Sequence, residues 1–174
     1  MTGLDRRVEH WVVTHRLAQL DQPFVWLSRV GTHGLVWLVL GAVAAVALRR
    51  PYLLLLVLAA DIVAELASSE LKEVVGRPRP HDPHALVGPP AGLSFPSGHA
   101  ATSFACATVL AAAIPRLAVP LFVLAAAIAF SRVYVGVHYP LDVLAGAALG
   151  IAVATALLLL VRARRGSRPA LPRG

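Results

Sequence analysis

Three short groups of polar residues stand out in a chain that is otherwise mostly apolar. Their lysine and arginines could bind the oxygens of a phosphoryl group, since one guanidinium can hold two oxygens at once. Their histidines and aspartate could supply a nucleophile and carry protons. This composition predicts phosphoryl transfer. The groups are Lys72, Arg79 and Pro80; Pro96-Ser97-Gly98-His99; and Ser131, Arg132, His138 and Asp142.

Spacing within the groups indicates how such a site would work. If a helix begins just after His138, that residue and Asp142 are four positions apart and can meet across one turn. The carboxylate would fix the imidazole tautomer and leave the other nitrogen as a base or nucleophile. His99 could then protonate the leaving oxygen. Ser97 is a suitable N-cap, Gly98 would let the backbone approach a ligand, and the following helix start would attract an anion.

The composition indicates a membrane protein. Of 174 residues, 57% are hydrophobic and 14% are charged, whereas soluble domains carry about 25% charged residues. The length suits a single domain over residues 1–174. We predict an all-α polytopic membrane bundle with about five transmembrane helices, each near the ~20 residues that cross a bilayer. The expected spans are Pro23–Leu48, Pro51–Leu71, Ser97–Ile114, Leu117–Val133 and Pro140–Val161.

The two ends of the chain differ from these spans. Within residues 1–22, Leu4, Val8 and Trp11 fall on one helical face, with charged residues elsewhere. This pattern predicts an amphipathic helix lying in the membrane interface, or an ordinary packed terminal helix. Residues 162–174 form a short basic tail that we expect to be disordered.

The net charge of +7 could indicate a nucleic-acid partner. Because the basic residues gather at the ends of apolar runs and no soluble basic face is available, we expect no nucleic-acid binding. Within the apolar runs, two features predict close packing between helices. Cys106, the only cysteine, should be a buried inert thiol, and Gly146 with Gly150 should let helices approach closely.

Counting the spans brings all three polar groups to one face of the membrane. They follow the second and fourth spans and precede the third and fifth. The opposite face receives many arginines and no acid among them, so the positive-inside rule makes it cytoplasmic. We therefore expect a multi-pass protein of the plasma membrane, with its site and N-terminus outside, although N-terminal arginines work against this orientation. The cytoplasmic arginines would be Arg49, Arg50, Arg116, Arg162, Arg164, Arg165, Arg168 and Arg173.

The polar groups resemble the signature of the type 2 phosphatidic acid phosphatase family, Lys-x6-Arg-Pro, Pro-Ser-Gly-His and Ser-Arg-x5-His-x3-Asp. All three parts are matched in order, and the resemblance covers about residues 60–160. It implies an integral-membrane lipid phosphatase that needs no metal or cofactor, although many members have six spans. It implies that His138 is the nucleophile that forms a phosphohistidine, Asp142 orients it, His99 is the general acid, and Lys72, Arg79, Ser97, Gly98 and Arg132 bind phosphate.

The implied substrate is a membrane lipid bearing a phosphate monoester or a pyrophosphate. Polyprenyl pyrophosphate, phosphatidylglycerol phosphate and phosphatidic acid all fit, and the sequence predicts neither the lipid nor the oligomeric state. Two alternatives share the motifs. A vanadate-dependent haloperoxidase would be soluble, which the apolar spans oppose. A catalytically silent lipid-binding or transport protein would not need His99, His138 and Asp142 together.

Several charged residues lie at positions that the matched motifs do not prescribe. Arg77 is expected to assist phosphate binding or to meet lipid headgroups. His81, Asp82 and His84 could be metal ligands, but the rim of a substrate loop or a solvated loop is the stronger interpretation.

One face of the second span carries an acidic stripe, which comprises Asp61, Glu65 and Ser68 and leads up to Lys72. At 1.5 Å per residue, the two acids lie roughly 16 Å and 10 Å below Lys72. Acids at such depth normally face the bundle interior with a partner. We predict that the acidic stripe packs inward and serves structure or the proton supply of the site. Possible partners are Arg29 and His33.

Overall fold

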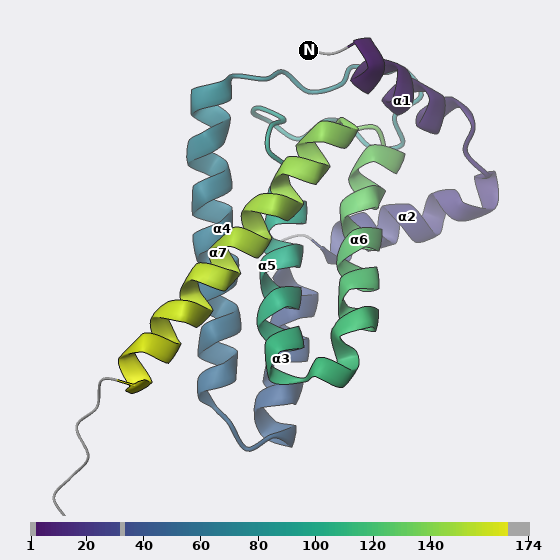
Figure 1. The fold of residues 1–174 in the computed structure, drawn as a ribbon. Helices are drawn as coiled ribbons and strands as arrows, with labels where there is room; N and C mark the ends of the chain where they lie inside the picture. Colours follow the sequence, from purple (N-terminus) through teal and green to yellow (C-terminus); the bar gives the residue numbers. More distant parts are fainter. Residues whose placement is uncertain (1–2, 32–33, 167–174) are drawn as a thin grey trace, which may run out of the picture.

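The computed structural model describes residues 3–31 and 34–166, and the regular structure in these ranges is entirely helical (Figure 1). The predicted all-α bundle is therefore confirmed. The elements are α1 (Gly3–Thr14), α2 (Ala18–Val30), α3 (Leu35–Ala47), α4 (Tyr52–Val75), α5 (Gly98–Ala113), the 3₁₀ helix η2 (Pro115–Leu117), α6 (Ala118–Tyr134) and α7 (Pro140–Gly166).

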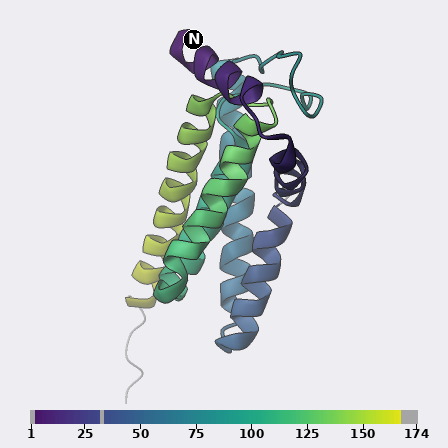
Figure 2. The ribbon, with the colours of Figure 1, turned by 90° about the vertical axis from the view of Figure 1, so that its right-hand side faces the viewer.

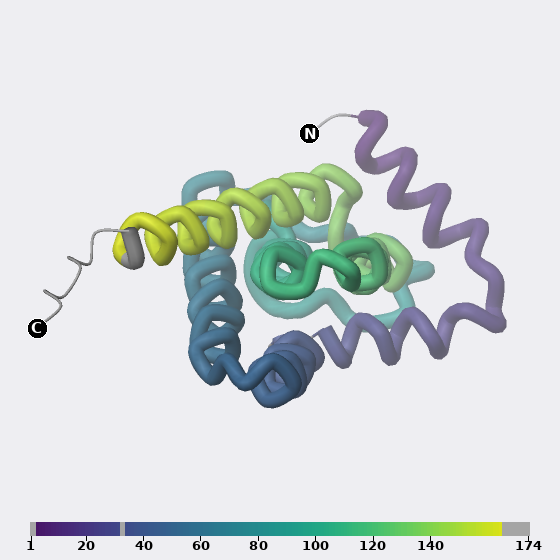
Figure 3. Tube along the Cα trace, turned by 60° about the horizontal axis from the view of Figure 1, so that its bottom comes forward, coloured from purple at the N-terminus to yellow at the C-terminus, as the bar shows by residue number. Residues whose placement is uncertain are grey.

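Helix α5 occupies the centre of the bundle and contacts α4, α6 and α7 (Figures 1 and 3). Its small side chains allow these neighbours to approach closely. The approach of α7 is the tightest at its two predicted glycines. A Cβ at Gly146 would lie 2.4 Å from the Ser97 carbonyl oxygen, and one at Gly150 would lie 2.1 Å from that of Ala101. The predicted role of these glycines in close packing is confirmed.

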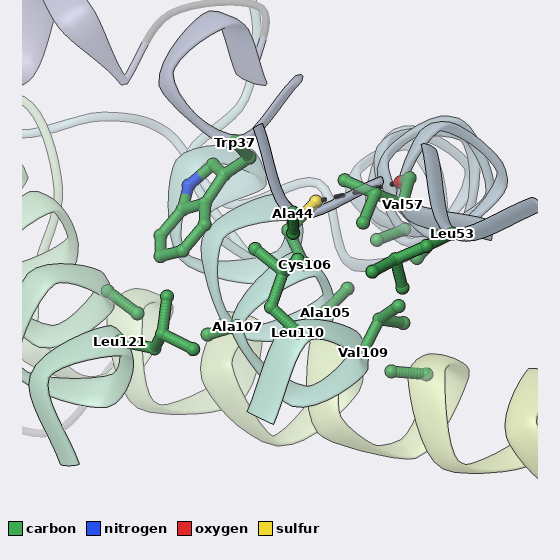
Figure 4. Close-up of a cluster of buried hydrophobic side chains, with 14 of the residues drawn as sticks. Trp37, Ala44, Leu53, Val57, Ala105, Cys106, Ala107, Val109, Leu110 and Leu121 are labelled. Atoms are coloured by element: carbon green, nitrogen blue, oxygen red, sulfur yellow. Dashed lines mark hydrogen bonds between the residues drawn. The ribbon is translucent and has the colours of Figure 1, made fainter. Parts of the chain in front are cut away.

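An apolar core fixes α3 and α4 against α5 (Figure 4). Trp37 is fully buried, and its indole N–H donates to Ser103 Oγ over 3.1 Å. Cys106 is buried as predicted, and its thiol lies 3.7 Å from the Val57 carbonyl oxygen, the contact dashed in Figure 4. The core thus sets the position of α5, which begins with the second polar group.

Three helical segments are long and apolar enough to cross a membrane: Tyr52–Val75, Pro115–Tyr134 and Pro140–Arg164. Helices α2 and α3 would add a fourth only if counted as one bent span, and α5 is shorter, at 16 residues. By length and composition, the described residues thus hold three or four candidate membrane spans, and the count of five stays a prediction.

The predicted span from Pro23 to Leu48 is not one straight helix, because α2 ends at Val30 and α3 begins at Leu35, bent from it by 66°. Gly34, at the N-cap of α3, has a φ of 64°, which does not continue a right-handed helix. The chain changes direction here, and α2 therefore lies beside α6 rather than in line with α3 (Figure 1).

The N-terminal segment also differs from its prediction. The amphipathic helix expected within residues 1–22 ends at Thr14, and α2 begins at Ala18. Helix α1 lies across the end of the bundle (Figure 2). Its acids face inward, with Asp5 and Glu9 buried, while Leu4 and Trp11 are 63% and 61% exposed. Acids inside and apolar side chains outside suit a helix whose outer face meets lipid.

At the other end, α7 extends to Gly166, so the first residues of the basic tail are helical. The expectation of disorder for residues 162–174 is therefore wrong for 162–166, and residues 167–174 lie outside the described ranges.

Candidate active site

All three polar groups lie at one end of the bundle, the top in Figure 1. The end of α4 carries the first group, the start of α5 the second, and the turn from α6 to α7 the third. The juxtaposition predicted by counting spans is confirmed. The opposite end holds the α3–α4 turn, with Arg49 and Arg50, and η2, with Arg116.

Local sequence explains where these helices stop and start. Helix α4 ends at Val75 and is capped by Gly76, which takes a left-handed φ of 65° and donates its N–H to the Lys72 carbonyl oxygen. The following Arg-Pro-Arg-Pro sequence disfavours further helix and leads away along the end of the bundle. Helix α7 begins at Pro140, whose missing N–H costs nothing at a first helical position.

His138 lies in the turn before α7 and is 2% exposed. Its Nδ1 is 3.4 Å from Asp142 Oδ2, and its Nε2 is 2.9 Å from Arg79 Nη1. Because a guanidinium only donates, Nε2 carries the lone pair and Nδ1 the proton. Burial lowers the pKa of His138 to about 4, despite the opposing effect of the Asp142 carboxylate. The imidazole is therefore neutral at pH 7, with Nε2 as the nitrogen that can attack.

Asp142 is completely buried, and its hydrogen bonds connect the start of α7 to the turn before it and to the start of α5. Its Oδ2 accepts the Tyr139 N–H over 2.9 Å as well as facing His138. Its carbonyl oxygen accepts the Ser97 N–H over 2.9 Å. The third polar group is thereby tied directly to the second, which fixes the imidazole relative to the start of α5.

Helix α2 supports two of the predicted site residues through Ser28, which the sequence did not single out. The buried Arg132 donates from Nη1 to Ser28 Oγ, and the His99 ring hydrogen-bonds the Ser28 backbone. Ser131 turns away from this site, because its hydroxyl donates to the Ile128 carbonyl oxygen over 2.6 Å within α6. The motif serine is thus a local helix contact.

Two predicted phosphate ligands have buried polar atoms without a partner among the described residues: Ser97 Oγ and Arg132 Nε. Ser97 does occupy the N-cap position of α5, but its hydroxyl makes no capping bond, so the predicted capping contact is wrong. Buried polar atoms are normally hydrogen-bonded. A hydroxyl and a guanidinium N–H that are both available suit an anion with several oxygens.

The other predicted phosphate ligands lie at the same end. Lys72, in the last turn of α4, is half-buried and close enough to Arg79 and Glu65 to interact with both electrostatically. Gly98 is buried, and a Cβ there would lie 2.7 Å from Glu65 Oε2. Packing against α4 therefore explains the glycine without reference to a ligand.

The acidic stripe of α4 packs inward only in part, because Ser68 is buried and Asp61 is half-buried, whereas Glu65 is exposed. It faces a cavity of about 340 Å³ beside the start of α5. Of the proposed partners, Arg29 lies over the Trp26 ring, 5.9 Å from its centroid, and His33 lies outside the described residues. The described residues that line the cavity are Gly31, Gly34, Asp61, Ile62, Glu65, Leu66, His99 and Thr102.

Arg77 serves neither of the roles predicted for it. It is buried, and its Nη1 donates to Asp142 Oδ1 over 2.6 Å, while its Nη2 donates to Asp5 of α1. Both Arg77 and Asp5 are thus linked to the candidate catalytic pair. Asp5 was not predicted from the sequence. The usable signal was a second acid one turn later on the same buried face of α1, at Glu9.

Two of the loop residues, Asp82 and His84, contact His10 of α1. Asp82 accepts from His10 and His84 over 2.7 and 2.8 Å, and His81 Nδ1 contacts the Arg79 carbonyl oxygen over 2.9 Å. Among residues 3–31 and 34–166, no group of three or more histidine, cysteine, aspartate or glutamate side chains is placed to hold a metal ion. The metal interpretation of this loop therefore has no support in the described residues.

Comparison with known proteins agrees with the resemblance of the polar groups. The model of the PAP2 superfamily matches residues 51–166. The chain is 42% identical over 130 residues to decaprenylphosphoryl-5-phosphoribose phosphatase of Mycobacterium tuberculosis, covering 73% of this chain and 72% of that one. It is 33% identical over 141 residues to undecaprenyl-diphosphatase of Sulfolobus acidocaldarius, covering 78% and 68%.

Two solved structures share the fold. The transmembrane PAP2-type phosphatidylglycerolphosphate phosphatase of Bacillus subtilis has a TM-score of 0.77 and 25% identity, covering 95% of this chain and 88% of that one. LpxE of Aquifex aeolicus has a TM-score of 0.78 and 28% identity, covering 91% and 96%.

Proposed function

The chain belongs to the PAP2 superfamily and is a membrane lipid phosphatase, and we propose that it transfers the phosphoryl group of its substrate to His138 and then to water. The observation that carries this proposal is the neutral, buried imidazole whose Nδ1 faces Asp142 and whose Nε2 faces Arg79. The candidate membrane spans and the relatives named as phosphatases disfavour a soluble haloperoxidase. The complete set of His99, His138 and Asp142 disfavours a silent binding protein.

The reaction proceeds in two balanced steps. His138 Nε2 attacks phosphorus, the bond from phosphorus to the lipid oxygen breaks, and that oxygen takes a proton from His99. Water then attacks the phosphohistidine and gives its proton to His99, which releases inorganic phosphate and restores His138. The phosphoryl oxygens are held by Lys72, Arg79, Arg132, the Ser97 hydroxyl and the backbone at Gly98, and no metal takes part.

Arg79 has two functions in this scheme. It holds the Nε2 lone pair of His138, and it also contacts the Val137 carbonyl oxygen over 3.1 Å. When phosphate oxygens bind this guanidinium, the lone pair is released toward phosphorus. Binding of substrate thereby exposes the nucleophile.

The role of His99 predicts a dependence on the leaving group. His99→Asn should slow release of phosphate from a lipid alcohol ester by about 10²–10⁴-fold, the range for a lost general acid. With p-nitrophenyl phosphate, whose leaving oxygen needs no proton, the loss should be much smaller. Both rates are measured by phosphate release at one pH. Equal losses on the two substrates would contradict the assignment of His99 as the acid.

We propose a polyprenyl-linked phosphate as the substrate class, with the site on the extracytoplasmic face. Two relatives, at 42% and 33% identity, are named for action on decaprenyl or undecaprenyl lipids. The arginines of the α3–α4 turn and of η2 lie at the end of the bundle away from the site, which supports a cytoplasmic position for that end.

The substrate is tested by phosphate release from a lipid panel. Purified protein would be given a decaprenylphosphoryl phosphosugar, a polyprenyl pyrophosphate, phosphatidylglycerol phosphate and phosphatidic acid, with the His138→Ala variant as control. We expect the highest kcat/KM on a polyprenyl lipid. A preference for phosphatidic acid would overturn the proposed substrate class, and equal release by wild type and the variant would overturn the mechanism.

The acidic stripe provides a separate test of proton supply. Glu65 shares the cavity with His99 and lies against the start of α5. If its carboxylate helps to return the proton to His99, Glu65→Gln should lower kcat by about tenfold, at the lower end for proton-transfer groups. Glu70→Gln, on an exposed part of α4, is the matched control. Unchanged turnover in both variants would leave the stripe with a structural role only.

A further inference from the structure

The carboxylate of Asp142 has a second strong partner besides His138. Its Oδ1 accepts from Arg77 Nη1 over 2.6 Å, and both side chains are buried, at 0% and 9% exposure. A buried cation this close would by itself cancel the charge that Asp142 presents to the imidazole. A neutralised Asp142 would stabilise the developing positive charge on His138 much less.

Helix α1 supplies the missing negative charge. Arg77 donates its other terminal nitrogen, Nη2, to Asp5 Oδ2, and the Asp5 side chain is 1% exposed. Asp5, Arg77 and Asp142 together carry one net negative charge, where Arg77 and Asp142 alone would carry none. In surroundings of low polarity that difference acts strongly on a neighbouring imidazole.

Asp5 also fixes the position of the catalytic turn. Its Oδ1 accepts the backbone N–H of Leu141, in the first turn of α7 and next to Asp142, over 3.0 Å. That N–H has no partner within its own helix. The Arg77 guanidinium lies 4.2 Å from the centroid of the Tyr139 ring, so the turn from His138 to Asp142 is held from two sides.

We propose that Asp5, acting through Arg77, is a positioning residue for the catalytic pair His138 and Asp142. This inference rests on the proposed function of that pair. It makes α1 a part of the active site, although α1 lies outside residues 51–166, which the superfamily match covers. In this proposal neither Asp5 nor Arg77 is a phosphate ligand.

The first experiment is the variant Asp5→Asn, assayed for phosphate release in detergent or vesicles. We expect kcat to fall about 10- to 100-fold, the range seen when hydrogen-bond partners of metal-binding histidines are removed, while KM changes by less than about threefold. Glu9→Gln, at a buried acid one turn along α1, is the matched control and should keep normal kcat. Wild-type kcat in Asp5→Asn would overturn the inference.

The pH profile separates positioning from a loss of folded protein. Besides Asp5 and Arg77, which act through Asp142, the charged groups that act on His138 are Asp142 of α7, Arg79 of the loop, Arg132 of α6 and His99 of α5. Removing the negative charge of Asp5 favours neutral imidazole further, so the acid limb of kcat/KM should move to lower pH while the plateau falls. A purely structural role would scale the profile at every pH without moving the limb.

A double-variant comparison gives the sharpest result. Arg77→Met leaves the buried carboxylates of Asp5 and Asp142 without their shared cation, so they repel each other. Adding Asp5→Asn to Arg77→Met should then raise kcat by about threefold or more, whereas the same change lowers kcat in the wild type. A further loss in the double variant would contradict the inference.

These outcomes remain distinguishable from failure of the proposed function. If His138→Ala retains activity on the same substrate, the mechanism fails. If His138→Ala is inactive while Asp5→Asn and Arg77→Met are both normal, only the inference about α1 fails. Should Asp5→Asn alone not fold, the comparison of Arg77→Met with the double variant still decides the question.

Discussion

His138→Ala is expected to lower kcat for phosphate release by about 10³-fold or more, as the removal of a nucleophile does in other enzymes. Among the described residues, neither neighbouring group is placed to replace it: the Asp142 carboxylate accepts from Arg77 and the Tyr139 N–H, and His99 donates to the Ser28 backbone. The measurement is single-turnover phosphate release, with folding checked by thermal unfolding.

The covalent intermediate makes this prediction more specific. After brief incubation with ³²P-labelled substrate, wild-type protein should carry a label that survives base and is lost in acid, as a phosphoramidate would. His138→Ala should carry none, and His99→Asn should still accept label from p-nitrophenyl phosphate. Label on His138→Ala would show that another residue is the nucleophile.

The pH dependence follows from the burial of His138. Its pKa of about 4 in the folded protein lies below its ordinary value, so the neutral imidazole is retained from pH 7 down to about pH 5. The same shift affects stability: this neutral histidine stabilises the fold above pH 6.5, and that contribution is lost as the pH falls toward 4.

The part of the site that could be predicted from the sequence is the part encoded by local spacing. His138 and Asp142 are four positions apart, and a helix that begins between them brings the two side chains together. Long apolar runs predicted helical segments, and counting them predicted that the three groups meet. Each of these inferences depends on a short stretch of chain or on the order of stretches.

The contacts that could not be predicted join residues far apart. Asp5 reaches Arg77 across 72 positions, and Ser28 reaches Arg132 across 104. Ser28 falls within an expected span that the structure breaks after Val30, so its direction could not be inferred. The inward pair of acids on α1, Asp5 and Glu9, was a usable signal, since buried acids need a cation.

The close crossing of α7 over α5 leads to a second large expected effect. Gly146→Ala places a Cβ 2.4 Å from the Ser97 carbonyl oxygen, and Gly150→Ala places one 2.1 Å from that of Ala101. Both obstacles are backbone atoms, which cannot rotate away as a side chain would. The helices must separate, at a cost of about 1–3 kcal/mol in the free energy of unfolding.

Separation of the two helices also moves the site apart, because α5 carries His99 while α7 carries Asp142. A misplacement of ~1 Å in an active site can lower the rate about 10²-fold. Gly146, one turn nearer to these groups, should therefore lose more activity than Gly150, although both variants lose thermal stability. Gly88→Ala is the control, because a Cβ there meets nothing within 4 Å. Thermal unfolding and phosphate release on the three variants test this order, and a normal rate in Gly146→Ala would mean that the crossing of α5 and α7 does not set the catalytic geometry.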